Sequence, residues 1–157
     1  MGVNVNQTLD AWMSQRKIDL IENYDRLGLR ASGDFERGVR IQPDNNSSAM
    51  YAPYHAWFMV NGRLPNQNQD EAAIKGFARW AGSTFLKDWV ERKGIKISPY
   101  AIGYSIARRG IIVPNKHNTG TLLTDTFTQK AYDDLYMALL FMYAAEFKTT
   151  IQKTWQQ

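Results

Sequence analysis

The chain has 157 residues, a net charge of +4, 44% hydrophobic residues and no cysteine. This length and hydrophobic content suit one folded domain, which we expect to span residues 1–157. The absence of cysteine excludes disulfide bonds, cysteine-ligated zinc and a thiol nucleophile, and two histidines are too few for a histidine-rich metal site. Five Trp, eight Tyr and seven Phe give a high aromatic content, which indicates a well-filled core, a binding surface, or both.

The first third of the chain predicts one helix followed by two strands. Apolar residues recur at steps of three and four over residues 7–27, which is the spacing of an amphipathic helix. Residues 34–42 alternate between apolar and polar side chains, which predicts a half-buried strand. The aromatic content of residues 50–60 predicts a second strand, with turn residues 43–48 between the two.

The middle of the chain predicts two helices after an exposed loop. The loop covers residues 63–69, and helical spacing then runs over residues 70–93. Gly82 and Ser83 lie in the middle of this run, where we expect a kink or a break into two helices. A further helix is predicted from Pro99 to Arg109, because proline favours the first position of a helix and Gly110 ends it.

A long C-terminal helix is predicted from Phe127 to about Lys153, with an N-cap at Asp125 or Thr126. The residues that we expect it to bury are Ala131, Leu135, Ala138, Leu139, Met142 and Ala145 or Glu146. The predicted fold class is therefore α+β: a small antiparallel β-sheet packed with an N-terminal helix, a central helix pair and a long C-terminal helix.

Membrane insertion and secretion are not expected. The N-terminus is polar and lacks the apolar segment of a signal peptide. The most apolar stretch, residues 135–147, is shorter than the ~20 residues that cross a bilayer. The sequence thus indicates synthesis in the cytoplasm and no membrane partner.

Enzymatic activity is not expected either. The sequence has no glycine-rich phosphate loop, no HExxH zinc motif and no GxSxG nucleophile motif. His55 could act as a general base together with Asp70 or Glu71, but a strand histidine bonded to backbone is the favoured interpretation. We therefore predict no catalytic residue, no cofactor and no metal.

Two groups of residues are candidates for binding. Arg40, Lys93 and Arg109 could contact DNA phosphates, although basic residues at helix ends also complement the helix dipole. A small basic nucleic-acid-binding protein is accordingly the alternative function. Trp12 and Trp155 lie near the chain ends and suit either the core or a subunit interface, since Trp is enriched at interface hot spots. Trp57 is the third Trp considered for such an interface.

An ordered set of motifs between Tyr51 and Pro114 resembles a known family. The motifs are Tyr51-Ala52-Pro53-Tyr54, then Phe58-Met59-Val60-Asn61-Gly62-Arg63-Leu64-Pro65, then Leu86-Lys87-Asp88-Trp89-Val90-Glu91-Arg92-Lys93-Gly94-Ile95, and last Tyr100-Ala101-Ile102-Gly103-Tyr104-Ser105-Ile106-Ala107-Arg108-Arg109-Gly110-Ile111. Together they are similar to the tail-completion and neck (head–tail connector) proteins of tailed bacteriophages. About 60 of the 157 residues carry the resemblance.

The resemblance implies a structural virion protein, synthesised in the host cytoplasm, whose residues 1–157 form one connector or tail-completion domain. Such proteins form homo-oligomeric rings that join the portal side of the capsid to the tail around the DNA channel. Neighbouring portal, connector or tail proteins and the packaged DNA are the implied partners. The resemblance places Arg63 in a loop that orders against a neighbouring subunit, and it lets Arg40, Lys93 and Arg109 face the DNA channel.

Overall fold

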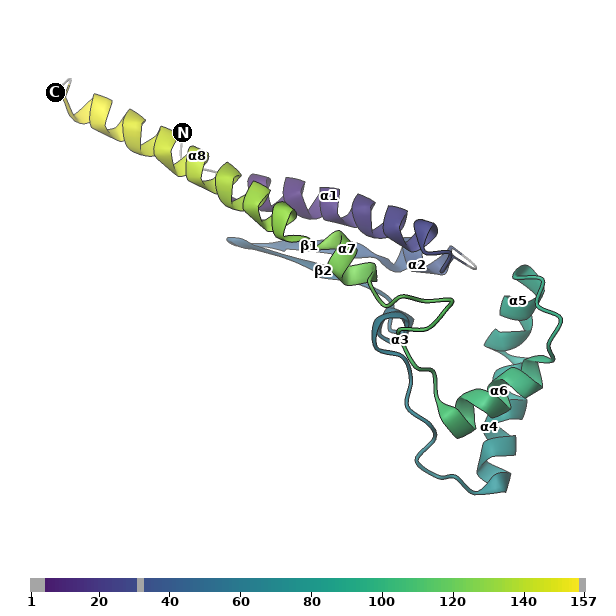
Figure 1. Ribbon diagram of the computed structural model, residues 1–157. Coiled ribbons are helices and arrows are strands. Elements are labelled where there is room, and N and C mark those ends of the chain that lie inside the picture. The colour runs from purple at the N-terminus through teal and green to yellow at the C-terminus, as the bar shows by residue number, and fades with distance from the viewer. Residues whose placement is uncertain (1–4, 31–32, 156–157) are drawn as a thin grey trace.

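The computed structural model describes residues 5–30 and 33–155. In this part of the chain, helices are arranged around one β-hairpin. The hairpin lies along the first helix, a group of shorter helices stands at one end, and the last helix projects from the other (Figure 1). The predicted α+β class is confirmed. The elements are α1 (Val5–Arg26), α2 (Asp34–Gly38), β1 (Arg40–Asp44), β2 (Ser47–Tyr51), α3 (His55–Asn61), α4 (Glu71–Ser83), α5 (Phe85–Arg92), α6 (Pro99–Arg109), α7 (Leu122–Thr126) and α8 (Gln129–Thr154).

The β-hairpin is short and is supported by α1. Strands β1 and β2 pair antiparallel, with Arg40 opposite Tyr51 at the open end and Asp44 opposite Ser47 next to the turn. Asn46 occupies the left-handed region (φ 57°), which asparagine tolerates well in tight turns. Its backbone N–H also donates to the Asn6 side chain at 2.7 Å, and this bond ties the turn to the start of α1.

The first core lies between α1, α2 and α7. It contains Leu20, Tyr24, Phe35, Val39 and Leu122, all of them almost fully buried. The rings of Tyr24 and Phe35 stack with their centroids 4.3 Å apart. Because α7 supplies Leu122, this core joins residues from both ends of the chain.

Two of the strand predictions are wrong in part. Residues 34–38 form α2, and β1 begins only at Arg40; Phe35 and Val39 are four residues apart, so one helical turn buries both as well as a strand would. The strand predicted over residues 50–60 ends at Tyr51, and residues 55–61 form α3. The Pro53 carbonyl accepts from the Ala56 N–H at 2.8 Å, so a helical turn starts where aromatic content favoured a strand.

The start of the last helix also differs from its prediction. Residues 122–126 form the separate short helix α7, and α8 follows it with Thr128 as its N-cap, whose side chain accepts from the Ala131 N–H at 3.2 Å. Thr126 is instead buried, where its hydroxyl donates to the Leu122 carbonyl at 2.7 Å and accepts from Asn23 at 3.2 Å. Satisfying that buried hydroxyl inside the core removes Thr126 from the capping position.

The second core belongs to a lobe of three helices, α4, α5 and α6, which we call the helical lobe. The predicted break in residues 70–93 is confirmed, because α4 ends at Ser83 and α5 begins at Phe85. Small residues bring α4 and α6 together: a Cβ added at Gly103 would lie 3.1 Å from the Ala78 Cα. The buried side chains are Ile74, Ala78, Ala81, Leu86, Val90 and Ala107.

The chain enters and leaves the helical lobe through one narrow point, which we call the waist (residues 62–63 and 110–111). Arg63 and Ile111 exchange two backbone hydrogen bonds there, of 2.8 Å and 2.7 Å. Gly62 and Gly110 both have positive φ, and a Cβ at either would lie 2.1–2.2 Å from the opposite backbone oxygen. The two segments are therefore too close for any residue but glycine at these positions.

We expect Gly110→Ala to destabilise the protein by about 1–3 kcal/mol, because the added methyl group meets the Arg63 carbonyl and the positive φ disfavours a side chain. Urea denaturation followed by circular dichroism measures the change. Gly76→Ala is the matched control: it lies inside α4 with nothing within 4 Å, so it should stabilise by about 0.5–1 kcal/mol. Equal stability of both variants would contradict the close packing at the waist.

Candidate functional site

The acid–base pair considered for His55 and Asp70 does not come together as a site. His55 is exposed at the start of α3, with its ring edge toward Phe35 at 6.2 Å. The Asp70 carboxylate accepts from the Ala72 N–H at 3.0 Å and so caps α4. Within residues 5–30 and 33–155, no three His, Asp or Glu side chains are grouped as metal ligands.

The Glu71 carboxylate has a shifted pKa, and the residues around it hold two helices together. The Lys75 ammonium and the Tyr104 hydroxyl beside Glu71 lower the pKa of that carboxyl, with a smaller effect from Arg108. Lys75 lies one turn along the same helix, and Tyr104 and Arg108 lie on α6. The cluster is exposed and links α4 to α6, which is an ordinary role for surface charges.

Trp12 packs within its own chain. Its ring lies 6.1 Å from Phe127 and 5.7 Å from Tyr132, and its Nε1–H donates to the Ala131 carbonyl at 2.8 Å. The Arg16 guanidinium lies over the same ring at 5.7 Å. Trp12 therefore fixes the first turn of α8 against α1, and its contact with another subunit stays a prediction.

Arg63 is also bound within its own chain. Its guanidinium lies 4.5 Å from the centre of the Phe77 ring and donates to Asn66 Oδ1 at 2.8 Å and to the Ile106 carbonyl at 3.4 Å. Its backbone pairs with Ile111 at the same time. Arg63 thereby joins the waist to both α4 and α6 and sets the position of the helical lobe.

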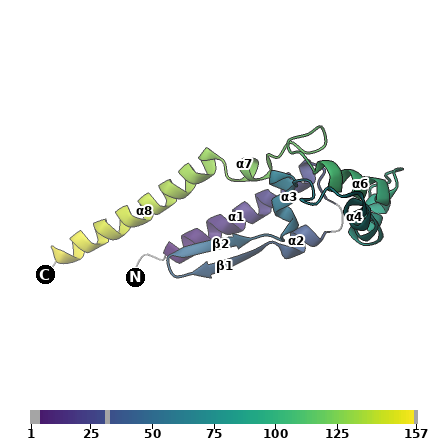
Figure 2. The ribbon, with the colours of Figure 1, turned by 90° about the horizontal axis from the view of Figure 1, so that it is seen from below.

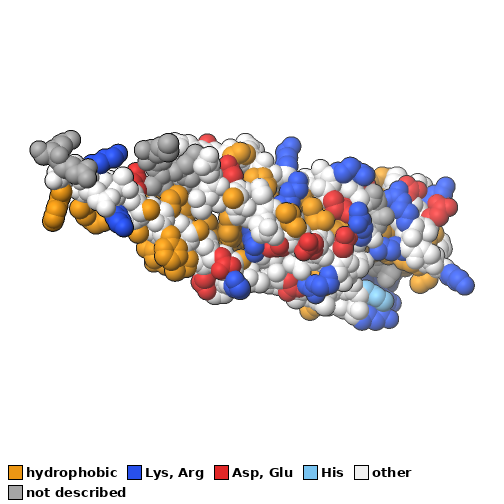
Figure 3. Space-filling view, turned by 90° about the horizontal axis from the view of Figure 1, so that it is seen from above, with side chains coloured by type: hydrophobic (Ala, Val, Ile, Leu, Met, Phe, Trp, Pro, Cys, Tyr) orange, Lys and Arg blue, Asp and Glu red, His pale blue; other side chains and the backbone are white. Residues whose placement is uncertain are grey.

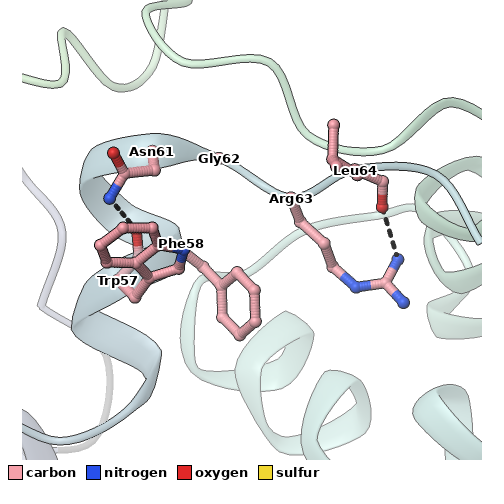
Figure 4. Close-up of a pocket in the computed structure, with 6 residues that line it drawn as sticks. All are labelled: Trp57, Phe58, Asn61, Gly62, Arg63 and Leu64. Atoms are coloured by element: carbon pink, nitrogen blue, oxygen red, sulfur yellow. Dashed lines mark hydrogen bonds between the residues drawn. The ribbon is translucent and has the colours of Figure 1, made fainter.

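Trp57 lies on an open hollow beside the waist. Its side chain is 62% exposed, and the hollow, of about 400 Å³, is also lined by Phe58, Asn61, Arg63 and Leu64 (Figure 4). In Figure 4 the Arg63 guanidinium points away from Trp57 and Phe58, and the Asn61 amide bonds to the Trp57 carbonyl at 3.1 Å. The hollow is an apolar surface feature and lacks the convergent polar groups of a small-molecule site.

The three basic residues considered for DNA contact come from separate elements. Arg40 begins β1 and lies over the Tyr51 ring at 5.6 Å. Lys93 follows α5, and its ammonium donates to the Gly28 carbonyl at 2.9 Å, where it caps the end of α1. Arg109 ends α6 and is exposed. In the described part of the chain, no recorded contact joins these three residues into one patch.

The surface that stands out is the apolar surface of α8. Of the 26 residues of this helix, Ala131 alone is buried among those described. The helix leaves the body of the protein and continues well past the end of α1 (Figure 2). Hydrophobic side chains gather at the end of the molecule that α8 forms (Figure 3). Its exposed large hydrophobic residues are Tyr132, Tyr136, Met137, Leu140, Phe141, Tyr143, Phe147 and Ile151, followed by Trp155 at the end.

The face of α8 that points to α1 is only partly covered. Leu135, Leu139, Met142 and Glu146 are half-buried, and the Thr8 hydroxyl donates to the Met142 sulfur at 3.5 Å. Ala138 and Ala145 are exposed. The predicted stripe therefore lies on the face turned to α1, but beyond Ala131 its residues are only half-buried or exposed, because α1 flanks only the first part of the helix.

Local sequence explains why this segment is helical without that support. Thr128 caps the N-terminus, and two side-chain pairs follow one turn apart, Gln129 with Asp133 and Lys130 with Asp134, both at 2.8 Å. The central residues 135–145 carry no charge. A helix that is apolar on most of its surface is normally buried. In the single chain, no described element buries the apolar surface of α8 beyond Ala131.

No described helix is both long and apolar enough to cross a membrane. Comparison of the chain with protein-family models, with curated proteins and with solved structures found no match.

We expect Arg63→Ala to lower the free energy of unfolding by about 1–2 kcal/mol, because it removes the contact with Phe77 and the bonds to Asn66 and Ile106. The free energy of unfolding of Arg63→Lys should lie between those of the wild type and Arg63→Ala, since a lysine ammonium cannot reproduce the planar guanidinium. Arg109→Ala is the control and should change stability by less than about 0.5 kcal/mol. Thermal denaturation measures all three, and indistinguishable Arg63→Ala and Arg109→Ala variants would contradict the role of Arg63.

Proposed function

We propose that the chain is a structural subunit of a tailed-bacteriophage particle and has no enzymatic activity. Several identical copies form a ring in the head–tail connector, neck or tail-completion region, around the channel through which DNA passes. The observation that carries this proposal is the uncovered apolar surface of α8, because such a surface is completed by other protein chains.

The amount of exposed apolar surface supports an obligate association. Single exposed hydrophobic residues are normal on soluble proteins, whereas contiguous patches above a few hundred Å² mark interaction sites. Phe141 and Phe147 are each about two-thirds exposed and lie less than two turns apart on α8. Trp155, one residue beyond α8, is 86% exposed, so the apolar surface continues to the end of the described chain.

The motifs that resemble connector proteins map onto a coherent part of the structure. The motif with Arg63 runs from α3 through the waist, the motif with Trp89 forms α5, and the motif with Ile106 forms α6. The resemblance therefore concerns the waist and the helical lobe, while α8 lies outside it. Both parts favour a subunit that contacts several neighbours, since a ring needs two different surfaces on each copy.

The proposal includes the partners and the location that the resemblance implies. The ring lies in the virion between portal-side and tail proteins, and the packaged DNA passes through it. Trp57, which is 62% exposed beside an open apolar hollow, and Trp155 are both available for contacts between subunits. Arg40 and Arg109 remain exposed for passive contact with DNA, without the dense basic surface that tight binding requires.

We expect the purified chain to form one species of fixed stoichiometry in analytical ultracentrifugation as its concentration rises. In particles of the phage that encodes it, mass spectrometry should detect several copies per virion. A phage that lacks it should accumulate DNA-filled heads without attached tails. A chain that stays monomeric at all concentrations and is missing from virions would contradict the proposal, as would a monomer that binds DNA with a steep salt dependence.

A further inference from the structure

Six exposed residues of α8 form a regular pattern along one side of the helix. They are Tyr132, Tyr136, Leu140, Tyr143, Phe147 and Ile151, with exposed fractions between 39% and 69%. Their spacings are four, four, three, four and four residues. We call this set the α8 stripe.

The α8 stripe repeats after eleven residues, with similar side chains at equivalent positions. Tyr132 corresponds to Tyr143, Tyr136 to Phe147, and Leu140 to Ile151, each pair eleven residues apart. An eleven-residue repeat corresponds to about 3.67 residues per turn, which keeps a seam between nearly straight helices with a slight right-handed supercoil. A repeat of this kind serves contact with another helix over its whole length.

We propose that the α8 helices of neighbouring copies pack side by side, parallel and in register, through the α8 stripe. The occupant of this surface is thus a second copy of the same helix. This inference rests on the proposed ring of identical subunits and adds which element holds the ring together.

The extent of the surface fits this occupant. An aromatic side chain covers about 150–250 Å², so the four rings of the stripe, about half to two-thirds exposed, offer about 350–600 Å² per chain. A stable interface buries about 800 Å² per partner, and Leu140 and Ile151 supply part of the remainder.

The neighbouring side of α8 provides contact with another helix. Met137 and Phe141 are exposed beside the stripe, and no charged residue interrupts residues 135–145. An apolar arc this wide suits a helix with a neighbour on each side, whereas a pair of helices needs only a narrow seam. Rotation about one axis keeps each residue of every copy at the same height, so α8 helices that pack side by side along the ring axis are parallel and in register.

Cross-linking tests this arrangement directly, because the chain has no cysteine of its own. Tyr136→Cys and Phe147→Cys are made singly and treated with a bis-maleimide that spans about 8–10 Å, the distance between packed helices. In a parallel, in-register bundle each variant cross-links to itself. In an antiparallel pair centred on the stripe, Tyr136 faces Phe147 of the other copy, so each single variant is separated from itself by about 16 Å and only their mixture reacts. Thr149→Cys, exposed on the opposite side of α8 from Phe147, is the control and should react less.

A charge inserted in the stripe provides the second measurement. Phe147→Glu should shift the assembly to monomer in ultracentrifugation with an unchanged circular dichroism spectrum, since this residue is 69% exposed in the single chain. Ile112→Glu, 78% exposed and outside both the α8 stripe and the Trp57 hollow, is the matched control and should leave the assembly intact. Failure of self-cross-linking by both cysteine variants, or an intact assembly with Phe147→Glu, would overturn the α8 bundle while leaving the ring itself in place. A wild-type chain that is monomeric and sediments with phosphatidylglycerol vesicles would overturn both the bundle and the ring.

Discussion

The constraint on which the structure depends is that the chain carries more apolar surface than its own two cores can cover. The first core buries two aromatic rings, Tyr24 and Phe35, and the helical lobe is packed largely through alanines such as Ala78 and Ala107. Most of the other large aromatic side chains lie at least partly at the surface. Because α8 gathers many of them on one helix, the hydrophobic effect favours a state in which that helix is covered by other chains.

The rest of the architecture separates this helix from the helical lobe. Trp12 fixes the beginning of α8 to α1, whereas Arg63 and the two close glycines, Gly62 and Gly110, fix the lobe at the waist. Helix α8 and the helical lobe are thus held by different contacts at different ends of the protein. A subunit of this kind can bind neighbouring copies through α8 while its helical lobe contacts a different protein. The proposed connector function requires both kinds of contact.

The sequence predicted the elements whose signals are long or chemically distinctive, and it missed those that depend on distant contacts. The break after Gly82 and the helix beginning at Pro99 follow from local backbone preferences, and both were predicted correctly. Residues 34–38 and 55–61 are too short for periodicity to separate strand from helix, and packing against α1 and Pro53 decides them. The internal partners of Arg63 and Trp12, which are Phe77 and Ala131, are set by tertiary packing, and no local signal reveals them. Contacts of Arg63 and Trp12 with other subunits stay predictions.

Amide hydrogen exchange of the wild-type chain tests most directly whether α8 is covered by other copies. Residues 147–154 are all exposed and follow Glu146, the last half-buried residue of α8, so in an isolated chain they should exchange rapidly through fraying. We predict that their exchange slows strongly as protein concentration rises, while residues of the first core stay protected throughout. Rapid exchange of residues 147–154 at every concentration would contradict the covering of α8 by other copies.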